Sequence, residues 1–146
     1  MNAGEIIQIA TPGEMYRDPK TQFVAGFLGN PPIAFLKGAS NGAAVNVANS
    51  DIIVPLPSRI RADAGRSLTL GIRPEDFGPQ GSVAIPGTVA FVETQGRENL
   101  YDVKLGNGSV LRSIQPVRDD VKVGDAVNWG AVDDKIMVFA EDGLRL

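Results

Sequence analysis

The stretch "LYDVKLGNGSVLRSI" (Leu100–Ile114) decides the fold of this chain. Apolar and polar residues alternate on both sides of the dipeptide Asn107-Gly108. Alternation with a period of two is the pattern of a strand with one buried face. Asn-Gly favours the tight turns that join neighbouring antiparallel strands. The stretch therefore predicts a β-hairpin.

Further strand-like runs lie on both sides of this hairpin, with turn signals about every ten residues. The runs are "IAFLK" (33–37), "AAVNVA" (43–48), "DIIVPL" (51–56), "SLTLGIR" (67–73), "GTVAFVET" (87–94), "DAVNW" (125–129) and "KIMVFA" (135–140). Asn41-Gly42 predicts a turn between the first two. In 67–73 the alternation places Leu68, Leu70 and Ile72 on one face and Thr69, Gly71 and Arg73 on the other. The pattern predicts a mainly β protein, a small barrel or sandwich of about eight strands.

The opening of the chain has a different character and predicts two short helices. Thr11, Pro12 and Glu14 match a capped helix start. Because Asp18 precedes Pro19, it is disfavoured in the helical conformation, so this helix ends there. Asp18 then caps the next helix, and Pro19 is the first residue of that helix.

The second helix carries an apolar stripe that requires a surface to cover. Phe23 and Phe27 are four residues apart, as are Val24 and Leu28, so both pairs lie on one face. Gly29 is a typical stop.

Composition excludes several classes of function. The 146 residues carry a net charge of −3, no cysteine and no histidine. Disulfides and thiolate metal sites are excluded, and the usual neutral-pH general base is missing. An acidic balance disfavours nucleic-acid binding. No phosphate-cradling G-x-x-x-x-G-K-[ST] motif occurs in the chain, and its pairs of adjacent carboxylates lie in predicted turns, so we predict no catalytic or metal-binding residues.

Two groups of residues are candidates for binding roles. Arg73 could bind an anion or a partner carboxylate with Glu75 locking it in place, although the simpler interpretation is that Pro74 ends the strand and the charges close a turn. Aromatic residues favour a core role, including Tyr101 and Trp129, whose exposure would be needed for base stacking. The same core role is predicted for Phe23, Phe27, Phe91 and Phe139.

Several stretches resemble a known family. "GEIIQIATPGEMYRDPKTQFVAGFLGNPP" (4–32) resembles the join in ATP-binding subunits of carbohydrate-import ABC transporters of the MalK/UgpC type. "LGIRPEDF", "FVETQGREN…YDVKL" and "VGDAVNW…IMVFAEDGLRL" are similar to the regulatory half of that family. The residues that match the pattern of the join are Gly4, Ile6, Gln8, Thr11, Pro12, Glu14, Tyr16, Pro19, Phe23, Val24, Ala25, Phe27, Gly29 and Pro31.

The resemblance implies a domain division and a fold. Residues 1–32 would be the tail of an ATPase domain with connector helices, packed through Phe23, Val24, Phe27 and Leu28. Residues 33–146 would be a TOBE domain, a small OB-like barrel. The nucleotide-binding core has no counterpart in this sequence, so the resemblance implies no ATPase activity and no cofactor here, with ATP and Mg²⁺ belonging to the parent subunit.

The resemblance also implies a regulatory and dimerisation role in an importer of carbohydrate or glycerol-phosphate-type solutes. Implied partners are a second copy through this domain, permease subunits through the ATPase domain, and a regulatory protein, at the cytoplasmic face of the cell membrane. Candidate interface or regulatory residues are Arg73, Glu75, Glu93, Gly96 and Arg97. The alternative is an OB-like domain that binds a small anion near Arg73 and Gly96-Arg97.

Overall fold

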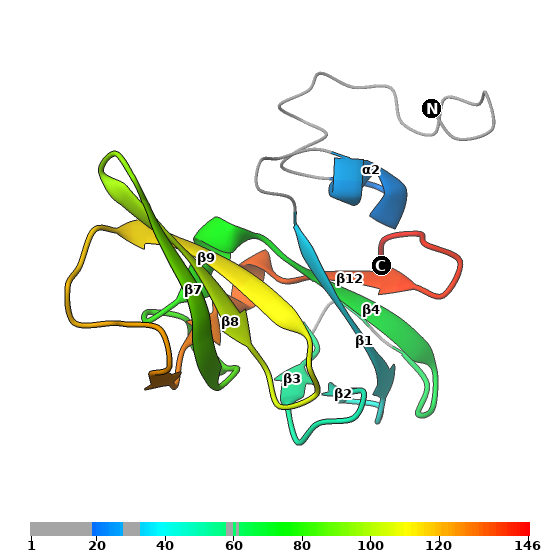
Figure 1. Cartoon of the computed structure of the whole chain (residues 1–146). Coiled ribbons are helices and arrows are strands. Elements are labelled where there is room, and N and C mark those ends of the chain that lie inside the picture. The colour runs from blue at the N-terminus through cyan, green and yellow to red at the C-terminus, as the bar shows by residue number, and fades with distance from the viewer. Residues whose placement is uncertain (1–18, 28–32, 58–59, 61) are drawn as a thin grey trace.

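The computed structural model describes residues 19–27, 33–57, 60 and 62–146, and it is mainly β (Figure 1). The helices are α2 (Gln22–Phe27) and two 3₁₀ turns, η1 (Pro74–Asp76) and η2 (Asp133–Lys135). The strands are β1 (Ala34–Ser40), β2 (Ala44–Val47), β3 (Ile53–Pro55), β4 (Ser67–Ile72), β5 (Phe77–Gly78), β6 (Val83–Ala84), β7 (Gly87–Gln95), β8 (Glu98–Lys104), β9 (Val110–Pro116), β10 (Ala126–Val127), β11 (Gly130–Ala131) and β12 (Met137–Ala140).

The strands form three antiparallel sheets. Their orders are β12-β4-β1-β2-β3, β10-β7-β8-β9 and β5-β11-β6. The hairpin predicted at Asn107-Gly108 is confirmed, because β8 and β9 pair from Lys104↔Val110 to Glu98↔Pro116. The OB-like, mainly β fold is therefore confirmed.

All nine predicted runs contain a strand, and three strands were not predicted. β5, β6 and β11 are two residues long, too short for an alternating pattern. Backbone pairing of β11 with both β5 and β6 holds them in place. The described part of the chain thus has more strands than the eight or so expected.

The main core lies where the sheets face one another. Leu70, Val45 and Leu111 are fully buried in it. Trp129 packs edge-on against Phe77 and Tyr101, with ring centroids 6.1 and 5.2 Å apart. The core role predicted for Tyr101 and Trp129 is confirmed, since they are 0% and 6% exposed.

β4 is buried on both faces, which its alternating sequence did not predict. Leu70 and its neighbours on that face lie in the main core, as expected. On the other face, Gly71 has Ile33 and Phe139 directly above it. A second apolar cluster covers this outer face; its buried members are Ala25, Ile33, Met137 and Phe139.

α2 is fastened to the C-terminal residues of the chain, and Figure 1 shows it beside that segment. The Gln22 amide donates to the Gly143 carbonyl (2.8 Å), and the Arg145 amide donates to the Lys20 carbonyl (2.9 Å). The second predicted helix is confirmed over Gln22–Phe27, and the first lies outside the described residues. Within the described ranges, every helix falls short of the length and hydrophobicity needed to span a bilayer.

The prediction that Phe91 belongs to the core is wrong. A β-bulge lies between Val89 and Phe91, and it inserts one extra residue into β7. Because side chains alternate along a strand, the extra residue turns Phe91 to the outer face, where it is 44% exposed. Phe23 is also 44% exposed and so is not a core residue of this chain, whereas Phe139 is fully buried as predicted. The side chain of Phe27 lies outside what the structure describes.

Candidate functional site

Arg73 and Glu75 lie in the turn that follows β4. Pro74 begins η1, and the Asp76 amide donates to the Arg73 carbonyl (2.9 Å). Burial and the neighbouring Glu75 raise the pKa of the Asp76 carboxyl, while the charges of Arg73 and Lys135 oppose that rise. The charge of Arg73 therefore acts on a half-buried carboxylate of its own turn.

Glu93, Gly96 and Arg97 lie at the tip of the β7–β8 hairpin. Gly96 and Arg97 form a two-residue loop between the paired residues Gln95 and Glu98. Gly96 has φ +65° at the first loop position, as a type II′ turn requires. Glu93 accepts a hydrogen bond from the Gln95 amide group (3.1 Å), and the Arg97 carbonyl accepts one from the Val117 amide (3.2 Å).

The end of β9 connects these two groups of candidate residues. Gln115 pairs with Asn99, two residues from the hairpin loop. Its side-chain amide donates to the carbonyl of Phe77 (3.0 Å), the residue that follows η1. The Ser113 hydroxyl donates to the same carbonyl. The structure thus places the turn after β4 and the hairpin tip on either side of β9.

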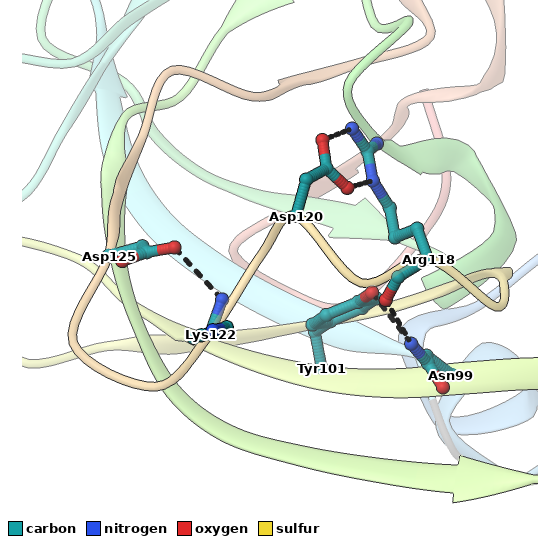
Figure 2. A network of polar contacts seen from close by, with 6 residues as sticks. All are labelled: Asn99, Tyr101, Arg118, Asp120, Lys122 and Asp125. Atoms are coloured by element: carbon teal, nitrogen blue, oxygen red, sulfur yellow. Dashed lines mark hydrogen bonds and ion pairs between the residues drawn. The ribbon is translucent and has the colours of Figure 1, made fainter.

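A polar network that the sequence analysis missed holds the segment after β9 (Figure 2). The Asn99 side chain donates to the Tyr101 hydroxyl (2.9 Å) and to the Arg118 carbonyl (3.3 Å), and it accepts from the Thr94 hydroxyl (2.8 Å). Asn99 is 3% exposed. The signal was present in the sequence, since alternation places Asn99 on the same face as buried Tyr101 and Val103.

The Arg118 guanidinium forms two hydrogen bonds of 2.6 Å with the Asp120 carboxylate. The guanidinium lowers the pKa of Asp120 to about 2. Farther along, the Gly124 amide donates to the Val89 carbonyl (2.8 Å) and the Val89 amide donates to the Asp125 carbonyl (2.9 Å), so the segment after β9 reaches the edge of β7 at Val89.

The described surface includes two open grooves of similar size. One of about 520 Å³ lies beside α2 and is lined in part by Lys37 and Glu141. One of about 530 Å³ lies between the β2–β3 turn and β8, lined in part by Lys104 and Asp51. Each groove thus pairs one lysine with one carboxylate, and neither Arg73 nor Arg97 lines them. Among the described residues, no group of three or more acidic side chains is placed to hold a metal ion.

The sequence family described as TOBE domain matches residues 70–139, the part of the chain from β4 to β12. Residues 70–139 therefore form a TOBE domain. The TOBE match begins within β4 and includes all the candidate residues of the two turns.

Curated relatives extend this finding over the whole chain. The chain is 37% identical to the sn-glycerol-3-phosphate import ATP-binding protein UgpC of Cereibacter sphaeroides over 150 residues, covering 100% of this chain and 41% of that protein. It is 32% identical to the maltose/maltodextrin import ATP-binding protein MalK of Mannheimia succiniciproducens, covering 98% of this chain and 41% of that protein. The chain thus spans about two fifths of the length of these relatives. The resemblance to the regulatory region of MalK/UgpC-type subunits is confirmed.

A solved structure shows the same fold. The cytoplasmic molybdate-binding protein ModG, crystallised with molybdate bound, aligns with a TM-score of 0.59 over 75% of this chain and 94% of that chain. Its sequence identity is 15%, so the likeness extends to the fold alone.

None of these findings tests the roles of individual residues. The interface or regulatory roles of Arg73, Glu75, Glu93, Gly96 and Arg97 stay predictions. The same holds for connector packing by Phe23, Val24, Phe27 and Leu28, of which Leu28 lies outside the described residues, and for the boundary between residues 32 and 33.

Proposed function

We propose that this chain works as the C-terminal regulatory region of the ATP-binding subunit of an ABC importer. The solutes would be carbohydrates or compounds of the glycerol-phosphate type. The similarity to UgpC- and MalK-named proteins along the whole chain carries the proposal. The TOBE domain at residues 70–139 supports it independently.

The proposed role is to hold two ATP-binding subunits together and to receive regulatory signals. A second copy binds through this domain, permease subunits bind through the ATPase domain, and a regulatory protein is a further partner. The subunit would work on the cytoplasmic side of the cell membrane. ATP and Mg²⁺ would be bound outside this chain, whose sequence has no phosphate loop.

The attachment of α2 suggests how the two parts communicate. α2 is bonded to the residues that follow β12, and Ala25 is buried against the outer face of the five-stranded sheet. A displacement transmitted to α2 would therefore move the packed five-stranded sheet as well, because α2 is not a flexible linker. The same attachment favours a connector that moves with the β domain as one body.

A chimera tests the proposed function. In Cereibacter sphaeroides UgpC, the region that this chain matches is deleted or replaced by this chain, in cells that lack their own copy. We expect the deletion to abolish uptake of labelled glycerol 3-phosphate and the chimera to restore a large part of it. The matched control replaces the same region by ModG, which shares the fold but not the sequence, and should not restore uptake. A chimera that is stably produced but as inactive as the deletion would refute the proposal.

The second candidate, small-anion binding, is motivated by the fold shared with a molybdate-binding protein. Calorimetry with molybdate, sulfate, phosphate and sugar phosphates distinguishes small-anion binding from the regulatory role. Heat with any of them that disappears in Arg73→Gln or Arg97→Gln would establish the anion site near those residues. Heat that disappears in Lys37→Gln or Lys104→Gln would instead establish a site in the corresponding groove. Absence of heat with all four would leave the regulatory role as the sole proposal.

A further inference from the structure

The dipeptide Asn-Gly occurs twice in this sequence, as Asn41-Gly42 and as Asn107-Gly108. Both copies lie in hairpin turns, the first between β1 and β2 and the second between β8 and β9. Asparagine followed by glycine is prone to spontaneous deamidation, because glycine has no Cβ to hinder attack of its nitrogen on the asparagine side chain. The two dipeptides are chemically identical, so a difference in their reactivity has to come from the fold.

The reaction needs only the chain itself and water. The Gly42 nitrogen loses its proton to water and forms a bond with Cγ of Asn41, which places a negative charge on Oδ1. The Cγ–Nδ2 bond then breaks, and Nδ2 takes up a proton and leaves as ammonia. Water opens the resulting five-membered succinimide at either carbonyl, giving aspartate or isoaspartate. One water is consumed, one ammonia is released, and nothing is oxidised or reduced.

The turn between β1 and β2 holds two hydrogen-bond donors on the oxygen where this charge develops. Oδ1 of Asn41 accepts from the backbone amides of Ala43 (3.0 Å) and Ala44 (2.8 Å). Donors at such distances stabilise the oxyanion of a tetrahedral intermediate. Asn41, Gly42 and Ala43 are all exposed, so water reaches the reacting atoms. The geometry of this turn therefore favours the reaction.

The surroundings of Asn107 differ at both ends of its side-chain amide. In the described part of the chain, its Oδ1 accepts from one backbone amide, that of Ser109 (2.9 Å). Its Nδ2 donates to the carbonyl of Ala48 in the β2–β3 turn (2.9 Å). The nitrogen that must leave as ammonia is thus bonded to a distant part of the chain, and this bond must break first.

The attacking amides do not distinguish the two sites. Gly42 donates to the Ser40 hydroxyl and Gly108 donates to the Leu105 carbonyl, at 3.0 Å in both cases. Each of these bonds must be given up before the nitrogen can attack. The difference in reactivity therefore depends on the two asparagine side chains.

We infer that Asn41-Gly42 is a site of spontaneous deamidation in the folded chain and that the fold protects Asn107-Gly108. The second donor on Oδ1 of Asn41 and the bond that holds Nδ2 of Asn107 act in the same direction. Removing one oxyanion donor from an enzyme slows its reaction about 100-fold or more. Because this turn is exposed to water, we expect the smaller factor of about tenfold between Asn41 and Asn107.

The two products should affect the sheet differently. An aspartate at position 41 has a carboxylate, which accepts from the same two amides at least as well as the asparagine oxygen does. Isoaspartate routes the main chain through Cβ and Cγ, so the turn becomes one carbon longer beside the paired residues Ser40 and Val45. We expect the isoaspartate form to loosen β2 and β3, which end the five-stranded sheet.

Peptide mapping by mass spectrometry tests the inference on the unaltered chain. Trypsin places the two dipeptides in separate peptides, because it cuts after Lys37, Arg59, Lys104 and Arg112. During incubation at mildly alkaline pH, Asn41 should deamidate about tenfold faster than Asn107 in the folded chain, and the two rates should converge in concentrated urea. Equal rates in the folded chain, faster reaction at Asn107, or a difference that persists in urea would overturn the inference.

A proline substitution tests the role of the two donors. Ala43→Pro removes one amide N–H that donates to Oδ1, so deamidation of Asn41 should slow about tenfold while that of Asn107 stays unchanged. If the two bonds merely restrain the side chain, the reaction would become faster instead, which would contradict the inference. Asn41→Gln is the control, because glutamine would have to form a six-membered ring and release of ammonia at position 41 should nearly stop.

Circular dichroism shows whether each variant keeps its fold. If Ala43→Pro alters the turn, the comparison of Asn41 with Asn107 still decides the question, since it needs no substitution. Neither result bears on the proposed function, which the uptake chimera tests separately.

Discussion

Replacing Asn99 by alanine should unfasten the segment after β9 from the sheet. Asn99 is 3% exposed and makes three hydrogen bonds, to Thr94, Tyr101 and the Arg118 carbonyl. Thr94 is exposed, so water can replace its bond at little cost. Tyr101 is fully buried, and its hydroxyl would lose its bond to Asn99. A lost bond costs about 1 kcal/mol and an unsatisfied buried group about 1–3 kcal/mol, so we expect a loss of about 2–4 kcal/mol of unfolding free energy.

Urea unfolding followed by circular dichroism measures this loss. With a slope of about 2 kcal/mol per molar urea, the midpoint should fall by about 1–2 M. Gln95→Ala, which removes an exposed hydrogen bond beside the loop, is the control and should cost less than about 0.5 kcal/mol. In Tyr101→Phe no hydroxyl remains, so adding Asn99→Ala should cost about 1 kcal/mol less than in the unaltered chain. A loss below about 0.5 kcal/mol for Asn99→Ala, or strict additivity with Tyr101→Phe, would refute the reasoning.

Two further predictions concern charge and close packing. The carboxyl of Asp120 should titrate by NMR near pH 2, and in Arg118→Gln its pKa should return toward the ordinary 3.8. Because the pKa of Asp120 is lower in the folded than in the unfolded chain, the Arg118–Asp120 pair stabilises the fold above pH 3.8. This stabilisation is lost as the pH falls through about 2. A titration that is the same in both proteins would show that Arg118 is not the cause. Gly81→Ala should cost more than about 2 kcal/mol, since its Cβ would collide with the backbone of Gly130, whereas Gly106→Ala, with open space around it, should be within about 0.5 kcal/mol in the same urea experiment. Equal stability of these two variants would contradict the close approach.

The sequence predicted the strands well because their evidence is local. Turn dipeptides and period-two alternation located nine of the strands, including the β8–β9 hairpin. The strands that escaped prediction, β5, β6 and β11, are held by backbone pairing among themselves and carry no pattern of their own.

The sequence-based predictions were wrong or incomplete where the burial of a side chain depends on contacts that its local sequence pattern does not reveal. The double burial of β4 depends on Ala25 of α2 and on Met137 and Phe139 of β12, the strand paired beside β4, and both elements lie far from β4 in sequence. The position of Phe91 depends on one extra residue in β7, and nothing in "TVAFVET" marks where the bulge falls. Asn99 could have been found, because a polar residue on the buried face of a strand requires partners.

The two sheets that share the main core give the chain two separate outer surfaces. α2 covers part of the outer face of the five-stranded sheet, and the outer face of β7, β8 and β9 points away from the same core. The aromatic cluster around Trp129 belongs to that shared core, so it lies between the two outer surfaces.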